Sequence, residues 1–184
     1  MILGLAPVAN AAPQCSIKAK VPSSARIFAK TDGQSAWHEY PGVAYVPDVR
    51  LDSGMTAQVV QHHNRITSIT VVSPGQIYWT YTRYCYAGDG DLSGVSYEVR
   101  TQLGWGYRVE GASTGGAFTS SLHEFFRTRD GKPIGKPVGV ADAPVDLHPT
   151  VYPSLGALPF AALLKPAPKA PGKQPAATLV STKN

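Results

Sequence analysis

Residues 76–103 read QIYWTYTRYCYAGDGDLSGVSYEVRTQL, and this stretch decides the fold class. Two runs rich in Tyr, Thr and Val, residue types that favour β-strands, flank the turn sequence Gly-Asp-Gly-Asp at 88–91. In the second run the side chains alternate between two faces: Val95, Tyr97, Val99 and Leu103 on one, and Ser96, Glu98, Arg100 and Gln102 on the other. The stretch therefore predicts two antiparallel strands joined by a tight turn.

The same organisation continues on both sides of this stretch. Runs of about 8–12 residues, each closed by Gly, Pro, Asn or Asp, are typical of antiparallel sheets. We expect strands within 15–29, 36–40, 55–63, 66–73, 76–87, 92–103, 104–111, 121–129 and 132–140. Because no long segment has the 3.6-residue period of a helix, we predict an all-β domain over residues 15–140: an antiparallel meander, a sandwich or a small barrel.

The composition changes after residue 140. Eight of the 16 prolines fall between Pro144 and Pro175, in a region that is also rich in Ala and Lys. Proline removes hydrogen-bond donors and keeps the backbone extended. Residues 141–184 are therefore predicted to form a flexible proline-rich tail, with docking of the apolar Leu155 to Leu164 as a short helix or strap left open.

The positive charge of the chain is concentrated in that tail. The net charge is +5, but residues 143–184 hold four Lys and one Asp, which leaves +2 for the other 142 residues. A nucleic-acid-binding domain concentrates Lys and Arg on its folded surface. We therefore expect no specific nucleic-acid partner, and the basic tail is interpreted as a solvated linker or as a weak contact with anionic polymers.

The N-terminus predicts export. Residues 1–12 are apolar and then small, and Ala9-Asn10-Ala11 fits the small-x-small pattern of signal-peptide cleavage. We interpret 1–12 as the remnant of a signal peptide, with an ordinary apolar first strand as the alternative. No later stretch reaches the roughly 20 apolar residues of a membrane-spanning helix. The predicted location is periplasmic or secreted.

The two cysteines, Cys15 and Cys85, support the same location. In an oxidising compartment a lone pair of cysteines favours a disulfide, here between the N-terminal segment and a predicted strand. Two alternatives are a lipid-acceptor Cys15, which the preceding Ala-Pro-Gln disfavours, and a catalytic thiol, which no neighbouring residue supports.

The densest candidate binding feature is aromatic. Alternation places Ile77, Trp79, Tyr81 and Cys85 on one face of the strand, interpreted as core, and an aromatic-hydroxyl ladder on the other face, formed by Tyr78, Thr80, Thr82, Tyr84 and Tyr86. Such a ladder stacks a sugar, a peptide or an aromatic ligand when it is exposed. Cross-strand packing is the alternative explanation.

Signatures of catalysis and metal binding are missing from the sequence. His62 and His63 are adjacent and point to opposite faces of a strand, and there is no short-spaced ligand pair or Gly-x-Ser-x-Gly elbow. We expect no metal and no cofactor, and we lean away from an enzyme. Glu98 and Arg100 share a strand face and are predicted to pair with a neighbouring strand.

One short motif resembles a known family. Ser93-Gly94-Val95-Ser96-Tyr97 is similar to the Ser-Gly-x-x-Tyr element of small periplasmic lysozyme inhibitors. The resemblance implies that Ser93 and Tyr97 lie on a barrel strand and reach an enzyme's active site. The sequence departs from that family after Trp105, where Gly106-Tyr107 stands in place of Lys-Gly.

Three functional hypotheses follow. The first is a non-enzymatic exported binding module for a protein or an envelope polymer, which uses an aromatic sheet face. The second is a periplasmic enzyme inhibitor or immunity-like protein. The third is a structural subunit of a surface assembly that forms homo- or hetero-oligomers through its tail. The candidate binding residues are Tyr78, Tyr84, Tyr86, Ser93, Tyr97, Glu98, Arg100 and Trp105.

Overall fold

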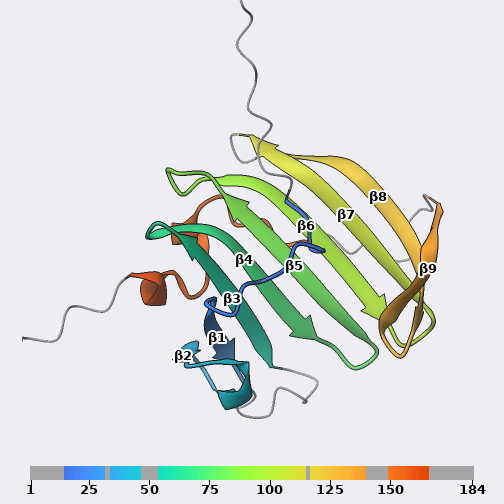
Figure 1. Ribbon diagram of the computed structural model, residues 1–184, viewed down its shortest axis with the longest axis horizontal. Helices are drawn as coiled ribbons and strands as arrows, with labels where there is room; N and C mark the ends of the chain where they lie inside the picture. Colours follow the sequence, from blue (N-terminus) through green and yellow to red (C-terminus); the bar gives the residue numbers. More distant parts are fainter. Residues whose placement is uncertain (1–14, 32–33, 47–53, 115–116, 140–148, 166–184) are drawn as a thin grey trace, which may run out of the picture.

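Nine antiparallel strands form one twisted sheet in the computed structural model of the chain, which describes residues 15–31, 34–46, 54–114, 117–139 and 149–165 (Figure 1). The strands are β1 (Arg26–Lys30), β2 (His38–Tyr40), β3 (Met55–His62), β4 (Arg65–Pro74), β5 (Tyr78–Tyr86), β6 (Leu92–Thr101), β7 (Trp105–Thr114), β8 (Ala117–Arg129) and β9 (Lys132–Gly139). The predicted signal remnant at 1–12 and the tail segments at 141–148 and 166–184 lie outside the described residues.

The strand order is β2-β1-β3-β4-β5-β6-β7-β8-β9, and every neighbouring pair is antiparallel. From β3 to β9 each strand pairs with the next one along the chain, which makes this part a meander. The predicted all-β antiparallel class is confirmed. Since the order begins at β2 and ends at β9, the described strands form an open sheet.

Tight turns connect the strands, as the turn residues predict. His63 and Asn64 between β3 and β4 have φ values of 48° and 61°, and Asp130 and Gly131 between β8 and β9 have values of 51° and 69°. Two-residue hairpin loops with positive φ at both positions match the right-handed twist of the strands they join. Asn, Asp and Gly tolerate this conformation better than most residues, so these turns fix the register of the flanking strands.

A C-terminal segment covers one side of the sheet. Residues 149–165, named the strap here, contain two 3-10 helices, η2 (Leu155–Ala157) and η3 (Ala161–Leu164). The strap buries Leu158, Phe160 and Leu164 in the main core, whose sheet residues include Phe28 and Ile69. The docking left open for Leu155 to Leu164 is confirmed, and the core extends past residue 140. We call this side of the sheet the strap face.

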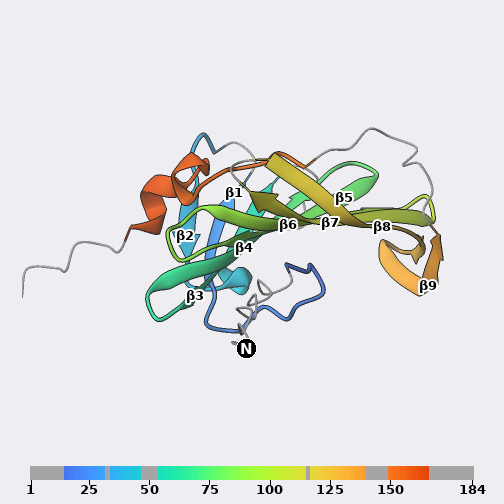
Figure 2. The same ribbon diagram turned by 90° about the horizontal axis from the view of Figure 1, so that it is seen from above.

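The N-terminal segment lies on the opposite side of the sheet (Figure 2). Cys15 forms the predicted disulfide with Cys85 of β5, which ties residues 15–18 across β5 and β6. We call this side the charged face. A small second core lies on it as well, near the short 3-10 helix η1 (Val43–Tyr45), where Ile27, Ala29 and Val46 are buried together.

Candidate functional site

The predicted site residues divide between the two faces of the sheet. The register pairs Thr82 with Tyr97 and Tyr84 with Val95, which places Tyr84 and Tyr97 on the strap face. The next residues along both strands point the other way, so Glu98 and Arg100 lie on the charged face. The alternation predicted for 95–101 is correct, but the predicted residues do not converge on one site.

Burial supports the packing explanation for most of the aromatic-hydroxyl ladder and contradicts the core position expected for Ile77. Tyr84 and Tyr86 are only 3% and 6% exposed because the strap covers them, whereas Ile77, predicted as core, is 50% exposed. Trp79 and Tyr81 are half-buried on the charged face, and Tyr78 is 37% exposed near the end of its strand. The ladder Tyr78 to Tyr86 is therefore mostly interior and forms no flat exposed surface.

A pocket of about 200 Å³ lies where this ladder meets the strap. Its floor is the strap face of four consecutive strands, β3 to β6, and its roof comes from the strap. The floor and rim residues are Trp37, Met55, Val71, Ser73, Thr80, Thr82, Tyr84 and Tyr97, and the strap contributes Pro149, Thr150, Tyr152, Pro159 and Phe160. Among these described lining residues none carries a formal charge, and hydroxyl groups alternate with aromatic rings.

Aromatic contacts hold the roof of the pocket on its floor. Phe160 packs against Trp37 with ring centroids 4.6 Å apart and stacks on Phe28 at 5.6 Å. Tyr152 meets Tyr84 edge to face at 5.4 Å, a favoured geometry for aromatic pairs. The Tyr84 hydroxyl also donates a 2.8 Å hydrogen bond to the carbonyl of Thr150. The pocket is therefore preformed by packing on both sides.

Burial changes the acidity of the phenols along this face. Loss of solvent raises the pKa of Tyr97 to about 12, with a further contribution from Tyr78. The pKa values of Tyr84 and Tyr86 are also raised, chiefly by burial. All three phenols are therefore neutral at physiological pH, and a neutral phenol is able both to donate and to accept a hydrogen bond. Tyr97 lines the pocket, which places its side chain within reach of a ligand.

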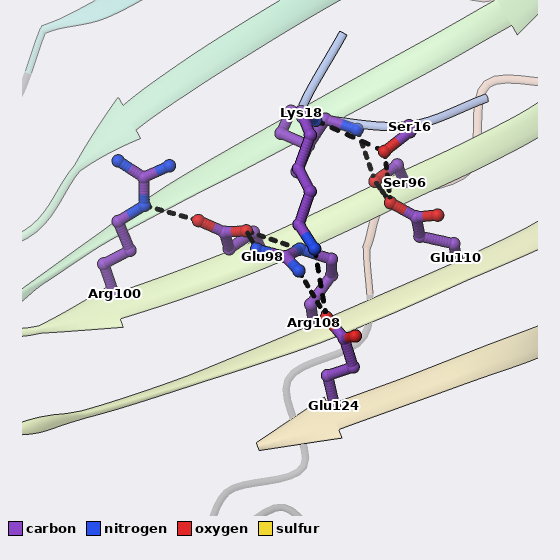
Figure 3. A network of polar contacts seen from close by, with 9 residues as sticks. Ser16, Lys18, Ser96, Glu98, Arg100, Arg108, Glu110 and Glu124 are labelled. Carbon is purple, nitrogen blue, oxygen red and sulfur yellow. Dashed lines mark hydrogen bonds and ion pairs between the residues drawn. The ribbon is translucent and has the colours of Figure 1, made fainter. Parts of the chain in front are cut away.

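The charged face carries a buried network of ionic side chains (Figure 3). Glu98 is completely buried, and its carboxylate pairs with Arg100 on its own strand and with Arg108 on β7. Arg108 also binds Glu124 of β8. Because Glu98 faces Arg108 and Arg108 faces Glu124 across the strand pairs, the sheet register itself places these charges together. The predicted pairing of Glu98 with a neighbouring strand is confirmed.

The N-terminal segment completes this network. Ser16 donates a 2.8 Å hydrogen bond to Glu110, which also accepts one of 3.0 Å from Ser96. Lys18 lies 3.7 Å from Glu124. Buried Arg83 donates to the carbonyl of Ser16 at 2.9 Å, and burial lowers its pKa. These contacts fasten the N-terminal segment to the sheet, so the network is structural and does not form an open site.

The inhibitor-like element also lies largely inside the protein. The Ser93 hydroxyl donates to the carbonyl of Cys85 at 3.0 Å. Gly94 lies directly beneath the disulfide, where an added Cβ would come within 2.9 Å of the Cβ of Cys15. Tyr97 points into the strap-face pocket and is 5% exposed. Trp105 lies apart from these residues and stacks on Phe125 at 6.1 Å. These residues do not form one projecting surface.

A larger hollow of about 1080 Å³ lies between the β3–β4 turn, the β5–β6 turn and η3. It is wide open and no aromatic side chain lines it. Arg26 at its edge is already paired with Glu39 and donates to the carbonyl of Leu163 in the strap. This pairing raises the pKa of Arg26 and lowers that of Glu39. Arg26 and Glu39 are therefore engaged with each other at the edge of this hollow and not with a ligand.

Sequence reasoning missed the strap's contribution to the pocket and the network partners Arg108 and Glu124. The strap residues come after the last strand of the sheet, and nothing local predicts which sheet face they cover. Arg108 and Glu110 share one face of their strand, as Glu98 and Arg100 share one face of theirs. The available signal was therefore that opposite charges on the two strands would face each other if the strands paired.

No protein-family model, no curated protein and no solved structure matches this chain. Among the described residues no helix is long and apolar enough to span a membrane, and no cluster of three His, Cys, Asp or Glu is arranged to hold a metal ion.

Proposed function

We propose that this protein is an exported binding module whose strap-face pocket binds, without catalysis, a neutral, hydroxylated ring such as one residue of an envelope glycan. The observation that carries the proposal is the pocket lining: aromatic rings and hydroxyl groups, with no formal charge among its described residues. Binding sites of this kind use apolar walls for affinity and a few polar groups for orientation. Export is supported by the disulfide, which persists in oxidising compartments.

The lining favours a sugar ring over a charged ligand for a simple reason. An ionised group moved into this pocket would lose its hydration without meeting an opposite charge, which is strongly unfavourable. A sugar ring has apolar C–H faces that pack on aromatic rings such as Trp37 and Phe160, and hydroxyls that exchange hydrogen bonds with Thr82 and Tyr97. A pocket of about 200 Å³ accommodates one such ring, with the rest of the polymer extending outside.

The test is a glycan array that carries neutral and charged oligosaccharides, followed by titration calorimetry with the strongest neutral ligand. We expect Tyr97→Phe, which removes only a hydroxyl, to weaken binding about tenfold, the equivalent of one hydrogen bond worth about 1.4 kcal/mol. The matched control is Tyr86→Phe, because Tyr86 is buried on the same face but does not line the pocket. Absence of any neutral glycan ligand, or equal effects of the two substitutions, would contradict the proposal.

A further inference from the structure

A β-bulge in β8 brings two reactive side chains to the same face of the sheet. Glu110 pairs with Leu122 and Gly111 with Ser120, so Ser121 is an extra residue in the ladder. In a regular strand Ser120 and His123 would point to opposite faces, since they are three residues apart. The bulge shifts the alternation by one position and places both on the strap face. Bulges re-aim side chains in this way and are common beside functional sites.

Gly111 makes this bulge possible. An added Cβ at Gly111 would lie 2.3 Å from the carbonyl oxygen of Thr119 and 2.6 Å from the ring of Phe118. Both distances are far below any normal contact, so only glycine allows β8 to approach β7 so closely here. The geometry at Ser120 and His123 is therefore fixed by the backbone of two strands.

Ser120, His123 and Tyr107 form a continuous chain of hydrogen bonds. The Oγ of Ser120 lies 2.8 Å from Nε2 of His123, and the hydroxyl of Tyr107 lies 2.8 Å from Nδ1 of the same ring. Ser120 and His123 are exposed, whereas Tyr107 is 8% exposed. A nucleophile within reach of a base that is itself oriented by a third group is the arrangement used in covalent catalysis.

Aromatic side chains flank this chain of hydrogen bonds on the same face. Phe118 lies on one side of Ser120, and Phe125, stacked on Trp105, lies beyond His123. Among the described residues β9 pairs with β8 only between Phe125 and Arg129, so no described strand pairs with the outer edge of β8 at Ser120 and His123. Alternate N–H groups of an unpaired edge point outward and are free to donate hydrogen bonds.

We propose that Ser120 is an acyl-accepting nucleophile activated by His123, and that esters with a small apolar acyl group are its substrates. This activity is separate from glycan binding in the pocket, which lies on β3 to β6. The flanking aromatic rings fit an apolar acyl group, and the outward N–H groups of the strand edge donate to the carbonyl oxygen as it gains negative charge.

The chemistry balances with water as the only co-reactant. Nε2 of His123 takes the proton of Ser120 as Oγ bonds to the ester carbonyl carbon, and the same proton passes to the alcohol as the carbon–oxygen bond breaks. Water then attacks the acyl-serine with His123 as the base, which releases the acid and restores Ser120. For this role Nδ1 of His123 must carry a hydrogen, which it donates to the phenol oxygen of Tyr107.

The decisive experiment uses the full chain, a fluorophosphonate probe and peptide mapping by mass spectrometry. Serine attack forms an O–P bond and releases fluoride, so the adduct marks the nucleophile. We expect Ser120 to be labelled about a hundredfold faster than Ser121, the low end of the range for a positioned base. Ser121 is the matched control because it is adjacent and exposed but donates instead to the carbonyl of Glu110.

Two substitutions give the second measurement. Hydrolysis of p-nitrophenyl butyrate is expected to fall about a hundredfold in His123→Gln and to the level of the uncatalysed reaction in Ser120→Ala, while Ser121→Ala keeps the wild-type rate. Because Ser120 and His123 are exposed, these variants should fold normally, which circular dichroism checks. Equal labelling of the two serines, or hydrolysis unchanged by Ser120→Ala, overturns the proposal.

Tyr107 is a positioning residue in this scheme. Tyr107→Phe removes the oxygen that accepts from Nδ1, so the His123 ring should shift toward the tautomer with hydrogen on Nε2. Two-bond ¹H–¹⁵N spectra of His123 report this tautomer directly, and a merely structural role would leave it unchanged. An unchanged tautomer together with an unchanged labelling rate removes Tyr107 from the proposal.

Discussion

The two faces of strands β5 and β6 have the same backbone but opposite chemistry. On the strap face, Val95 lies in the core that the C-terminal strap completes, and Tyr97 lines the pocket under the strap. On the charged face, Ser96 and Glu98 lie in a network of ionic and hydroxyl groups under the N-terminal segment. The comparison teaches that burial alone does not make a sheet face apolar, provided that its charges are paired.

The two faces also differ in how they contribute to stability. Burial of apolar surface on the strap face is favourable in rough proportion to the area removed from water. Burial of Glu98 and Arg108 is unfavourable unless each charge keeps its partners. We therefore expect the strap face to tolerate conservative substitutions and the charged face to be sensitive to the loss of a single partner.

The largest expected effect is on the charged face. Glu98→Gln leaves the buried guanidinium of Arg108 without its main partner, so the free energy of unfolding should fall by about 3–5 kcal/mol. Urea denaturation measures this change. The control is Glu39→Gln, whose side chain is 44% exposed in its pair with Arg26 and whose replacement should cost about 1 kcal/mol or less. Similar losses in the two variants would show that the buried network is not what distinguishes this face.

A somewhat smaller effect is expected from removal of the disulfide that holds the N-terminal segment on the charged face. Replacing Cys15 and Cys85 together by Ser opens a loop with a sequence separation of 70 residues. Chain entropy predicts a loss of up to about 4 kcal/mol, reduced by any structure in the unfolded chain. Denaturation of the oxidised protein and the double variant measures the difference. An unchanged unfolding midpoint would mean that the hydrogen bonds of Ser16 and Ile17 alone hold the segment.

The smallest effect concerns the strap face and is visible only at high pH. Burial raises the pKa of Tyr97 to about 12, whereas an unfolded tyrosine ionises near pH 10. The unfolded state therefore releases a proton first, and stability should fall as the pH rises from about 10 to 12. Urea denaturation across this pH range tests whether the free energy of unfolding falls, and in Tyr97→Phe it should fall less steeply with pH. Stability that increases above pH 10 would contradict the raised pKa of Tyr97.

Much of the fold follows from local sequence. The strands β3 to β7 begin and end close to the turn residues that predict them, and the period of two places Val95 and Glu98 on opposite faces. The disulfide also follows, because a lone pair of cysteines favours a disulfide where the compartment is oxidising. Both predictions rest on short-range geometry or on a single pair of residues.

The candidate sites could not be found in the same way. Alternation shows which residues share a face, but the covering segments come from residues 15–18 and 149–165, far away in the chain. That distance is why alternation alone leaves open whether Tyr84 is exposed or packed, although it lies in the core. The position of Ser120 and His123 on one face could not be predicted for a different reason, because a bulge breaks the period of two on which strand prediction depends.

The order in which the chain is made gives the strap a further consequence. A nascent chain that ends near residue 140 already contains all nine strands but lacks Leu158, Phe160 and Leu164. Its apolar strap face, with Phe28, Ile69 and Val95, would then be open to other chains during synthesis. Completion of the core must wait for the strap, which follows the last strand, so a truncation designed at the apparent end of the sheet would yield an aggregating product.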